Sequence, residues 1–171
     1  MGDKILIAYA SRTGATTGVA ETIGEVLREA GAAVDVRPAR EVTDLSPYRA
    51  VVAGSAIYMG QWMKDSVRFV DRHRDALSKM PVAYFAVCLT MKDDTEENRC
   101  TVGAYLDPVR EKVPAAEPVS VGLFAGALDR SKLSFLFRAI IKKMGAPEGD
   151  FRDWEAIRAW AEELVPLLGR G

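Results

Sequence analysis

Short apolar runs alternate with amphipathic stretches along the chain. Residues 5–10 form a continuous apolar run, and Val19, Ile23, Val26 and Leu27 follow at the spacing of one helix face. An apolar run of this length predicts a strand buried on both faces. The alternation continues toward the C-terminus, which predicts βα units around a parallel sheet.

The pattern predicts five strands joined by helices. Five such units predict an α/β fold with a doubly wound five-stranded parallel sheet of order 2-1-3-4-5, helices on both faces, and one domain over residues 1–171. Ligands of such sheets bind outside the carboxyl ends of the strands, so the loops after strands one, three, four and five are expected to share one crevice. The strands are expected at residues 5–10, 33–37, 50–54, 82–89 and 119–125, and the helices after the first at residues 63–77, 98–112 (interrupted near Pro108), 132–144 and 154–168.

A hydroxyl-rich turn joins the first strand to the first helix. Backbone N–H groups at a helix N-terminus and the helix dipole favour an anion, and a glycine lets the backbone approach closely. The turn is therefore predicted to bind a phosphate; the alternative is an ordinary polar turn that caps the helix. Its residues are Ser11, Arg12, Thr13, Gly14, Ala15, Thr16 and Thr17.

This turn differs from two familiar phosphate-binding loops. The chain has no G-x-x-x-x-G-K-[ST] sequence, and no G-x-G-x-x-G follows the first strand. Residues 11–16 instead resemble the [ST]-x-T-G-x-T phosphate loop of the flavodoxin family, at the end of the first strand where that family has it. The resemblance implies a flavodoxin-like fold and a bound FMN.

The loop after the third strand is the second candidate for cofactor contact. Small residues there let a planar ring lie close, aromatic side chains offer a face to it, and the Gly60 N–H can approach a flavin N5. Alternatively, Tyr58 and Trp62 simply cover the end of the sheet. The candidate residues are Ser55, Ala56, Ile57, Tyr58, Met59 and Gly60.

The loop after the fourth strand departs from electron-carrier flavodoxins, which commonly have a stacking tyrosine there. Thr90, Met91 and Lys92 occupy this place, and we expect their backbone groups to reach the ring edge. Four acidic residues lie just beyond, within residues 93–97. They form either a solvated face or a negative field that lowers the flavin potential.

The C-terminal third sharpens the resemblance. Residues 125–128, 137–144 and 153–155, together with residues 54–60, are similar to the menaquinone-dependent protoporphyrinogen oxidase branch of the flavodoxin superfamily. That branch is FMN-dependent and passes electrons from a porphyrinogen to a quinone. The resemblance places Gly126, Ala127 and Leu128 beside the flavin ring.

Composition excludes several other classes. The formal net charge of −1 gives no support for nucleic-acid binding, and no apolar run could span a bilayer. The first strand begins almost at once, so we expect no signal peptide. Cys88 and Cys100 form neither a disulfide framework nor a metal cluster, and no metal is expected. The predicted location is cytoplasmic.

Residues 132–144 combine large apolar side chains with four lysines and arginines. Such a helix can lie on an anionic membrane surface, which would suit a quinone-linked enzyme. The alternative is a helix packed on the sheet with a solvated basic edge.

Three functions follow from these interpretations. The first is an FMN oxidoreductase that resembles quinone-linked protoporphyrinogen IX dehydrogenase, with a porphyrinogen substrate and a quinone or redox partner protein. The second is an electron carrier of the flavodoxin type without its own substrate. The third is a non-redox binding module that has lost its flavin. The first two require no catalytic side chain, because the flavin carries the redox chemistry.

Overall fold

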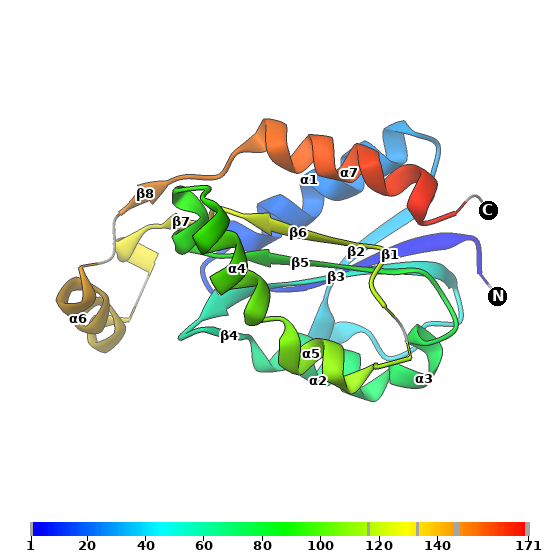
Figure 1. Cartoon of the computed structure of the whole chain (residues 1–171), viewed down its shortest axis with the longest axis horizontal. Coiled ribbons are helices and arrows are strands. Elements are labelled where there is room, and N and C mark those ends of the chain that lie inside the picture. The colour runs from blue at the N-terminus through cyan, green and yellow to red at the C-terminus, as the bar shows by residue number, and fades with distance from the viewer. Residues whose placement is uncertain (1, 116, 133, 146–147, 170–171) are drawn as a thin grey trace.

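A twisted sheet with helices on both faces forms the centre of the molecule (Figure 1). The computed structural model describes residues 2–115, 117–132, 134–145 and 148–169. Five strands pair in parallel in the order β2-β1-β3-β5-β6, and the short β4 pairs antiparallel with β3. The predicted order is confirmed, because β5 and β6 are the fourth and fifth parallel strands. These strands are β1 (Lys4–Ala10), β2 (Val34–Pro38), β3 (Tyr48–Tyr58), β4 (Gln61–Trp62), β5 (Val82–Val87) and β6 (Ser120–Phe124).

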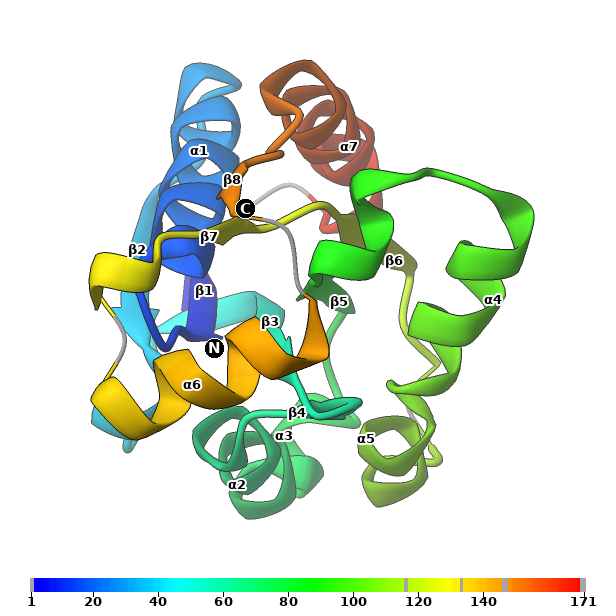
Figure 2. The same ribbon diagram turned by 90° about the vertical axis from the view of Figure 1, so that its left-hand side faces the viewer.

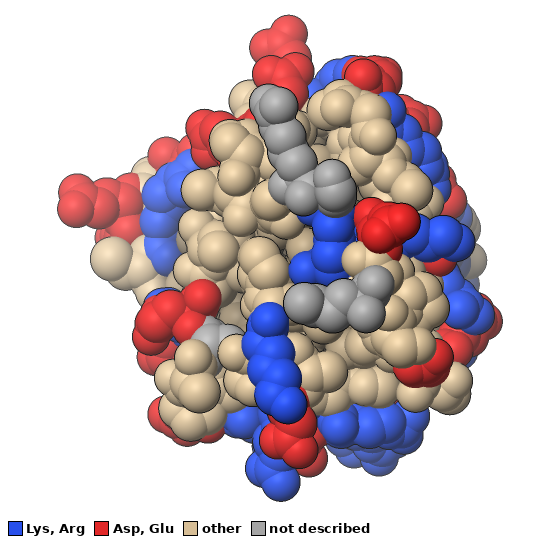
Figure 3. Space-filling view, turned by 90° about the vertical axis from the view of Figure 1, so that its right-hand side faces the viewer, with Lys and Arg blue, Asp and Glu red and all other residues tan. Residues whose placement is uncertain are grey.

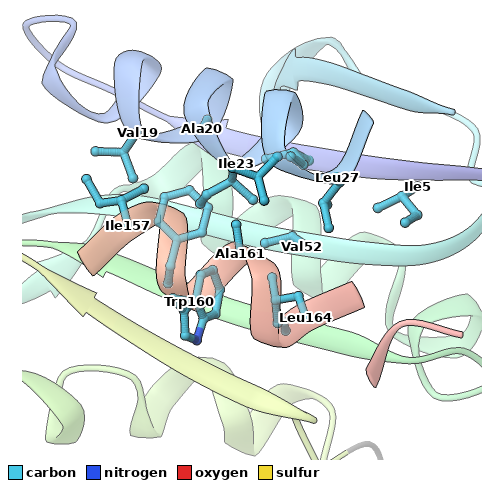
Figure 4. Close-up of a cluster of buried hydrophobic side chains, with 14 of the residues drawn as sticks. Ile5, Val19, Ala20, Ile23, Leu27, Val52, Ile157, Trp160, Ala161 and Leu164 are labelled. Atoms are coloured by element: carbon cyan, nitrogen blue, oxygen red, sulfur yellow. The ribbon is translucent and has the colours of Figure 1, made fainter. Parts of the chain in front are cut away.

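Two helices cover one face of the sheet. Helix α1 (Ala15–Glu29) packs against α7 (Trp154–Leu167), and both bury aliphatic side chains on β1, β3 and β5. Asp153 caps α7, and its carboxylate accepts a hydrogen bond from the Ala156 N–H. Figure 4 shows the labelled side chains of this core pointing toward one another: Ile5, Val19, Ala20, Ile23, Leu27, Val52, Ile157, Trp160, Ala161 and Leu164.

Shorter helices cover the opposite face. The predicted helix over residues 63–77 is wrong as a single element, because the backbone leaves helical geometry at His73. The His73 ring at this break is half-buried and packs against the Phe69 ring, with 5.0 Å between the ring centroids. The predicted interruption near Pro108 is confirmed. These helices are α2 (Lys64–Arg72), α3 (Arg74–Leu77), α4 (Glu96–Ala104) and α5 (Asp107–Lys112), with 3₁₀ turns at Ala39–Glu41 and Leu89–Lys92.

Between β6 and α7 the chain forms a segment that extends away from the sheet. Strands β7 (Ala127–Leu128) and β8 (Gly149–Asp150) pair antiparallel and form a narrow ribbon. Between them lie a 3₁₀ turn (Arg130–Lys132) and α6 (Phe135–Met144), which begins three residues later than predicted. In Figure 2, α6 crosses in front of the carboxyl ends of the strands.

The opposite end of the molecule holds both termini. The Arg49 side chain of β3 donates hydrogen bonds to the carbonyls of Asp3, Leu168 and Gly169, which ties the first strand to the last helix. In Figure 3, acidic and basic side chains are intermixed over the described part of this face. No large area of one charge gathers in that part.

Candidate functional site

The hydroxyl-rich turn lies at the carboxyl end of β1, where it leads into α1. Gly14 takes the left-handed conformation (φ 97°) and provides no side-chain cap for the helix. The Gly14 N–H donates to the Ser11 hydroxyl at 3.0 Å, which closes the turn. The N–H groups of the first turn of α1 therefore remain available to a ligand, because helix geometry gives them no intrahelical acceptor.

Thr16 provides the most informative polar group of the turn. Its side chain is 1% exposed, and its Oγ1 has no hydrogen-bond partner among the described residues. A buried hydroxyl without a partner is unfavourable unless a ligand or water satisfies it. At a helix N-terminus, that ligand is best an anion. The residues at this end of the site therefore fit the phosphate of the predicted FMN.

A crevice of about 120 Å³ extends from this turn over the ends of β3, β5 and β6. Most of the predicted site residues line it: Ser11, Arg12, Thr13, Ala15, Thr16, Ala56, Ile57, Tyr58, Gly126, Ala127 and Leu128. The topology thus brings together three predicted segments that lie far apart in the sequence, as expected for the carboxyl edge of a doubly wound sheet.

The structure corrects the predicted loop at residues 55–62. Strand β3 continues to Tyr58, and β4 returns antiparallel to it. The two strands are joined by a tight turn in which Met59 (φ 53°) and Gly60 (φ 73°) both take positive φ. Such a turn matches the twist of a hairpin. The prediction failed because small and aromatic residues near a sheet end are equally compatible with a loop.

Several predicted residues lie beside the crevice but do not line it. The Ser55 side chain is fully buried: its hydroxyl donates to the Ala56 carbonyl and accepts from the Met63 N–H at 2.8 Å, so it holds the hairpin in place. Gly14, Met59 and Gly60 form turns next to the crevice and do not line it. The predicted cofactor contacts of these residues stay predictions.

Residues 90–92 lie away from the crevice. The Met91 side chain is buried in a separate apolar cluster, and Lys92 lies over the Phe151 ring at 5.3 Å. The Thr90 carbonyl accepts a hydrogen bond from Asn98. Leu89 takes the place at the crevice that the sequence assigned to residues 90–92. The 3₁₀ turn that begins at Leu89 causes this change, because it folds the next residues back toward α4.

The acidic residues beyond this turn are exposed to solvent. Asp94 forms an ion pair with Arg99, and this hydrogen-bonded guanidinium lowers the pKa of the Asp94 carboxyl. None of the four acidic side chains lines the crevice. Their placement favours the interpretation as a solvated face.

Arg12 closes the mouth of the crevice together with α6. Its guanidinium carbon lies 4.5 Å from the Tyr58 ring centroid and 4.3 Å from that of Phe137. The two rings are 4.9 Å apart. Sequence reasoning missed Phe137 and Ile141, which line the crevice from α6. Their i, i+4 spacing was the available signal, since it places both on one helix face.

The crevice as a whole is small for a ligand with a planar ring system. About 120 Å³ is less than the ~300–1,000 Å³ of pockets that bury a drug-sized ligand. The fixed walls are favourable, because Ala56, Gly126 and Ala127 are small. Arg12 and Phe137 line the same crevice and are stacked on each other, with the Arg12 guanidinium carbon 4.3 Å from the Phe137 ring centroid.

Arg152, which follows β8, attaches this part of the chain to α1. Arg152 forms an ion pair with Asp150 at 2.6 Å and donates to the Ala15 carbonyl at 3.3 Å. The hydrogen-bonded guanidinium lowers the pKa of the Asp150 carboxyl. The ribbon of β7 and β8 is therefore attached directly to the first turn of α1, which sets where α6 crosses the crevice.

Comparisons with known proteins agree with this architecture. The family model described as "Flavodoxin domain" matches residues 6–154. The chain is 28% identical to the protein named protoporphyrinogen IX dehydrogenase [quinone] from Leishmania major, over 96% of this chain and 75% of that protein. It is also 28% identical to the protein of the same name from Escherichia coli K12, over 98% of this chain and 97% of that protein.

Solved structures show the same fold at lower sequence identity. Oxidised flavodoxin 1 from Bacillus cereus superposes with a TM-score of 0.62 at 17% identity, covering 97% of this chain and 99% of that one. A flavodoxin from Streptococcus pneumoniae TIGR4 gives 0.62 at 20% identity, covering 95% and 97%. With the hydroxyl-rich turn, the sheet order and a family model that matches most of its length, the chain belongs to the flavodoxin domain family.

Proposed function

We propose that this protein is an FMN-dependent oxidoreductase that dehydrogenates a porphyrinogen and passes the electrons to a quinone. The observation that carries the cofactor assignment is the buried Thr16 hydroxyl, which has no partner among the described residues and lies at the N-terminus of α1. The substrate and acceptor are suggested by the names of the two relatives that are 28% identical.

The residues of the crevice have distinct parts in this proposal. Bound FMN would supply reversible two-electron chemistry. The Thr16 hydroxyl and the first N–H groups of α1 would hold its phosphate, and Arg12 would add positive charge. Leu89 and Leu128 would exclude water from one side of the ring, while the small Ala56 would let the ring approach β3 closely. We assign no side chain as an acid, base or nucleophile.

We also propose that α6 places the protein on an anionic membrane surface, where a quinone is found. No helix within the described residues is both long and apolar enough to cross a membrane. Phe135 and Leu136 are nevertheless 86% and 73% exposed on α6, with Lys142 and Lys143 exposed at its end. Exposed large apolar side chains beside lysines favour the interface between lipid headgroups and acyl chains.

The first test is the visible absorption spectrum of the purified protein, with the released cofactor identified after denaturation. Flavin bands and released FMN are expected, followed by oxidation of protoporphyrinogen IX with a soluble quinone as acceptor. If the protein binds FMN and exchanges electrons with a reductase but does not oxidise the porphyrinogen, it is an electron carrier instead. No flavin bands and no binding of added FMN would identify a binding module and overturn the proposal.

A further inference from the structure

A second hollow lies on the far side of the β3–β4 hairpin, between α2 and α5. Its volume is about 360 Å³, within the ~300–1,000 Å³ typical of ligand pockets. Figure 2 shows β4 above α2 and α3, with α5 to its right. Apolar and aromatic side chains form most of its wall: Trp62, Val67, Tyr105, Pro108 and Val109. Three long polar side chains complete it: Gln61, Lys64 and Arg68. We call this hollow the α2–α5 groove.

The groove and the FMN crevice share one structural element. The hairpin lines the crevice with residues 56–58 and the groove with Gln61 and Trp62. The turn between them touches the groove wall, since a Cβ on Gly60 would lie 3.4 Å from the Tyr105 ring. A ligand in the groove would therefore lie next to the hairpin that borders the proposed flavin ring.

The positive charges at the groove are not neutralised by the protein. Lys64 and Arg68 are one helical turn apart on α2 and are exposed, and neither forms an ion pair with any residue that the structure describes. At the other end of α2, by contrast, Asp71 pairs with Lys112 of α5 at 4.0 Å. The two cations nearest the hairpin are thus free to bind an anion.

The floor of the groove contains an unused hydrogen-bond donor. Trp62 is 4% exposed, and its Nε1–H has no acceptor among the described residues. Its ring meets the buried Tyr84 ring edge-on at 5.7 Å, and the Tyr84 hydroxyl also lacks a partner there. The indole of Trp160, in contrast, donates to Ser120 at 2.9 Å. Buried polar groups are normally satisfied, so the Trp62 Nε1–H indicates a missing partner beside the groove.

We propose that the α2–α5 groove binds a bulky, mostly apolar ligand that carries carboxylates. The apolar body lies against Trp62, Tyr105 and Pro108, and the carboxylates pair with Lys64 and Arg68. We take this ligand to be the porphyrinogen substrate, and that part of the inference rests on the proposed function. Binding in the groove itself requires neither turnover nor lipid.

The test is equilibrium binding of deuteroporphyrin IX, an apolar dicarboxylate, to the flavin-loaded protein. Porphyrin fluorescence anisotropy and tryptophan quenching report the complex. The double variant Lys64→Glu, Arg68→Glu is expected to weaken binding at least tenfold, because opposite charges replace both partners. Arg40→Glu with Lys79→Glu is the matched control: the charge change is the same, both side chains are exposed, and both lie outside the groove and the crevice.

Two further probes separate the apolar and charged parts of the site. The dimethyl ester of deuteroporphyrin keeps the ring and removes both carboxylates, so we expect it to bind at least tenfold more weakly. Trp62→Phe is expected to abolish most of the quenching while anisotropy still reports a complex. Equal affinity of acid and ester, or of the wild type and the Lys64/Arg68 variant, would overturn the proposal, as would an equal loss in the control variant.

The outcome for the groove can be separated from that of the proposed function. Flavin content is measured by visible absorption on the same samples. Normal flavin content and turnover with charge-insensitive porphyrin binding would overturn only the groove. Porphyrin binding that depends on Lys64 and Arg68 in a protein that never binds FMN would keep the groove and overturn the oxidoreductase.

Discussion

Helices α1 and α6 are both amphipathic, but the apolar face of α1 is buried and that of α6 is largely exposed. On α1, Val19, Ile23 and Leu27 are at most 1% exposed, because the sheet and α7 cover them. On α6, the apolar Phe135 and Leu136 are largely exposed. The comparison teaches that hydrophobic periodicity predicts a helix and its apolar face, but does not identify what covers that face.

The attachment of α6 is correspondingly thin. Of its described side chains only Phe137 is buried, at 9% exposure, and Ile141 is half-buried. The helix is nevertheless well bounded, because Ser134 caps its start and Gly145 ends it with φ 70°. Local signals therefore form α6 while few tertiary contacts hold it, which suits an element that moves to admit a ligand.

The largest expected effect is on stability. Ile23→Ala removes a buried side chain from α1 and is expected to lower the free energy of unfolding by about 2–5 kcal/mol. Ile140→Ala changes a residue of α6 that is 42% exposed, and a change within about 0.5 kcal/mol is expected. Urea denaturation of both variants measures the difference. Equal losses would mean that α6 is as integral to the core as α1.

The next effect concerns the exposed face of α6. Phe135→Ser with Leu136→Ser is expected to weaken binding to vesicles containing phosphatidylglycerol on the order of a hundredfold, because each large apolar side chain contributes about 1.5–3 kcal/mol when fully buried. Co-sedimentation measures the binding, and the melting temperature should hardly change. The matched control is Val119→Ser with Leu167→Ser, which removes two exposed apolar side chains elsewhere. Unchanged sedimentation of the α6 variant would exclude this face as the docking surface.

Much of the fold could be predicted because its signals are local. The apolar runs give the five parallel strands, and the hydroxyl-rich turn marks the start of α1. The third strand was predicted too short: residues 55–58 carry a serine and a tyrosine at a sheet end, and their pairing with β4 depends on a turn with positive φ at Met59. A non-glycine residue in that conformation has no clear signature in the sequence.

The site was less predictable because it depends on distant parts of the chain. The position of Leu89 in the crevice depends on how the following 3₁₀ turn folds back. The position of Phe137 depends on the β7–β8 ribbon and on the contact of Arg152 with the Ala15 carbonyl, 137 residues away in the sequence. Such contacts follow from tertiary packing, and periodicity within one helix does not report them.

A smaller effect, on FMN affinity, is expected at the N-terminus of α1. Thr16→Val keeps the shape of the buried side chain and removes its hydroxyl. We expect FMN affinity to fall about tenfold, since a hydrogen bond to a charged group contributes about 1.5–3 kcal/mol. Flavin fluorescence titration measures it, and Thr22→Val, at a half-buried residue of α1 that lies outside the turn and the crevice, is the control. Removal of an unsatisfied buried hydroxyl should also stabilise the protein in the absence of FMN. An unchanged affinity would contradict the phosphate assignment.

The smallest expected effect concerns the contact that joins the two helices. Arg12 precedes α1, and its guanidinium lies over the rings of Tyr58 and Phe137. An exposed cation–π contact contributes about 0.5–1 kcal/mol. Arg12→Ala should therefore accelerate amide hydrogen exchange in α6 of flavin-free protein about two- to fivefold, with α1 unchanged. Arg12→Lys keeps the charge but loses the planar stack, so an intermediate rate is expected. Equal acceleration in both helices would show that Arg12 supports the core, whereas an effect confined to α6 would identify it as the latch of a mobile helix.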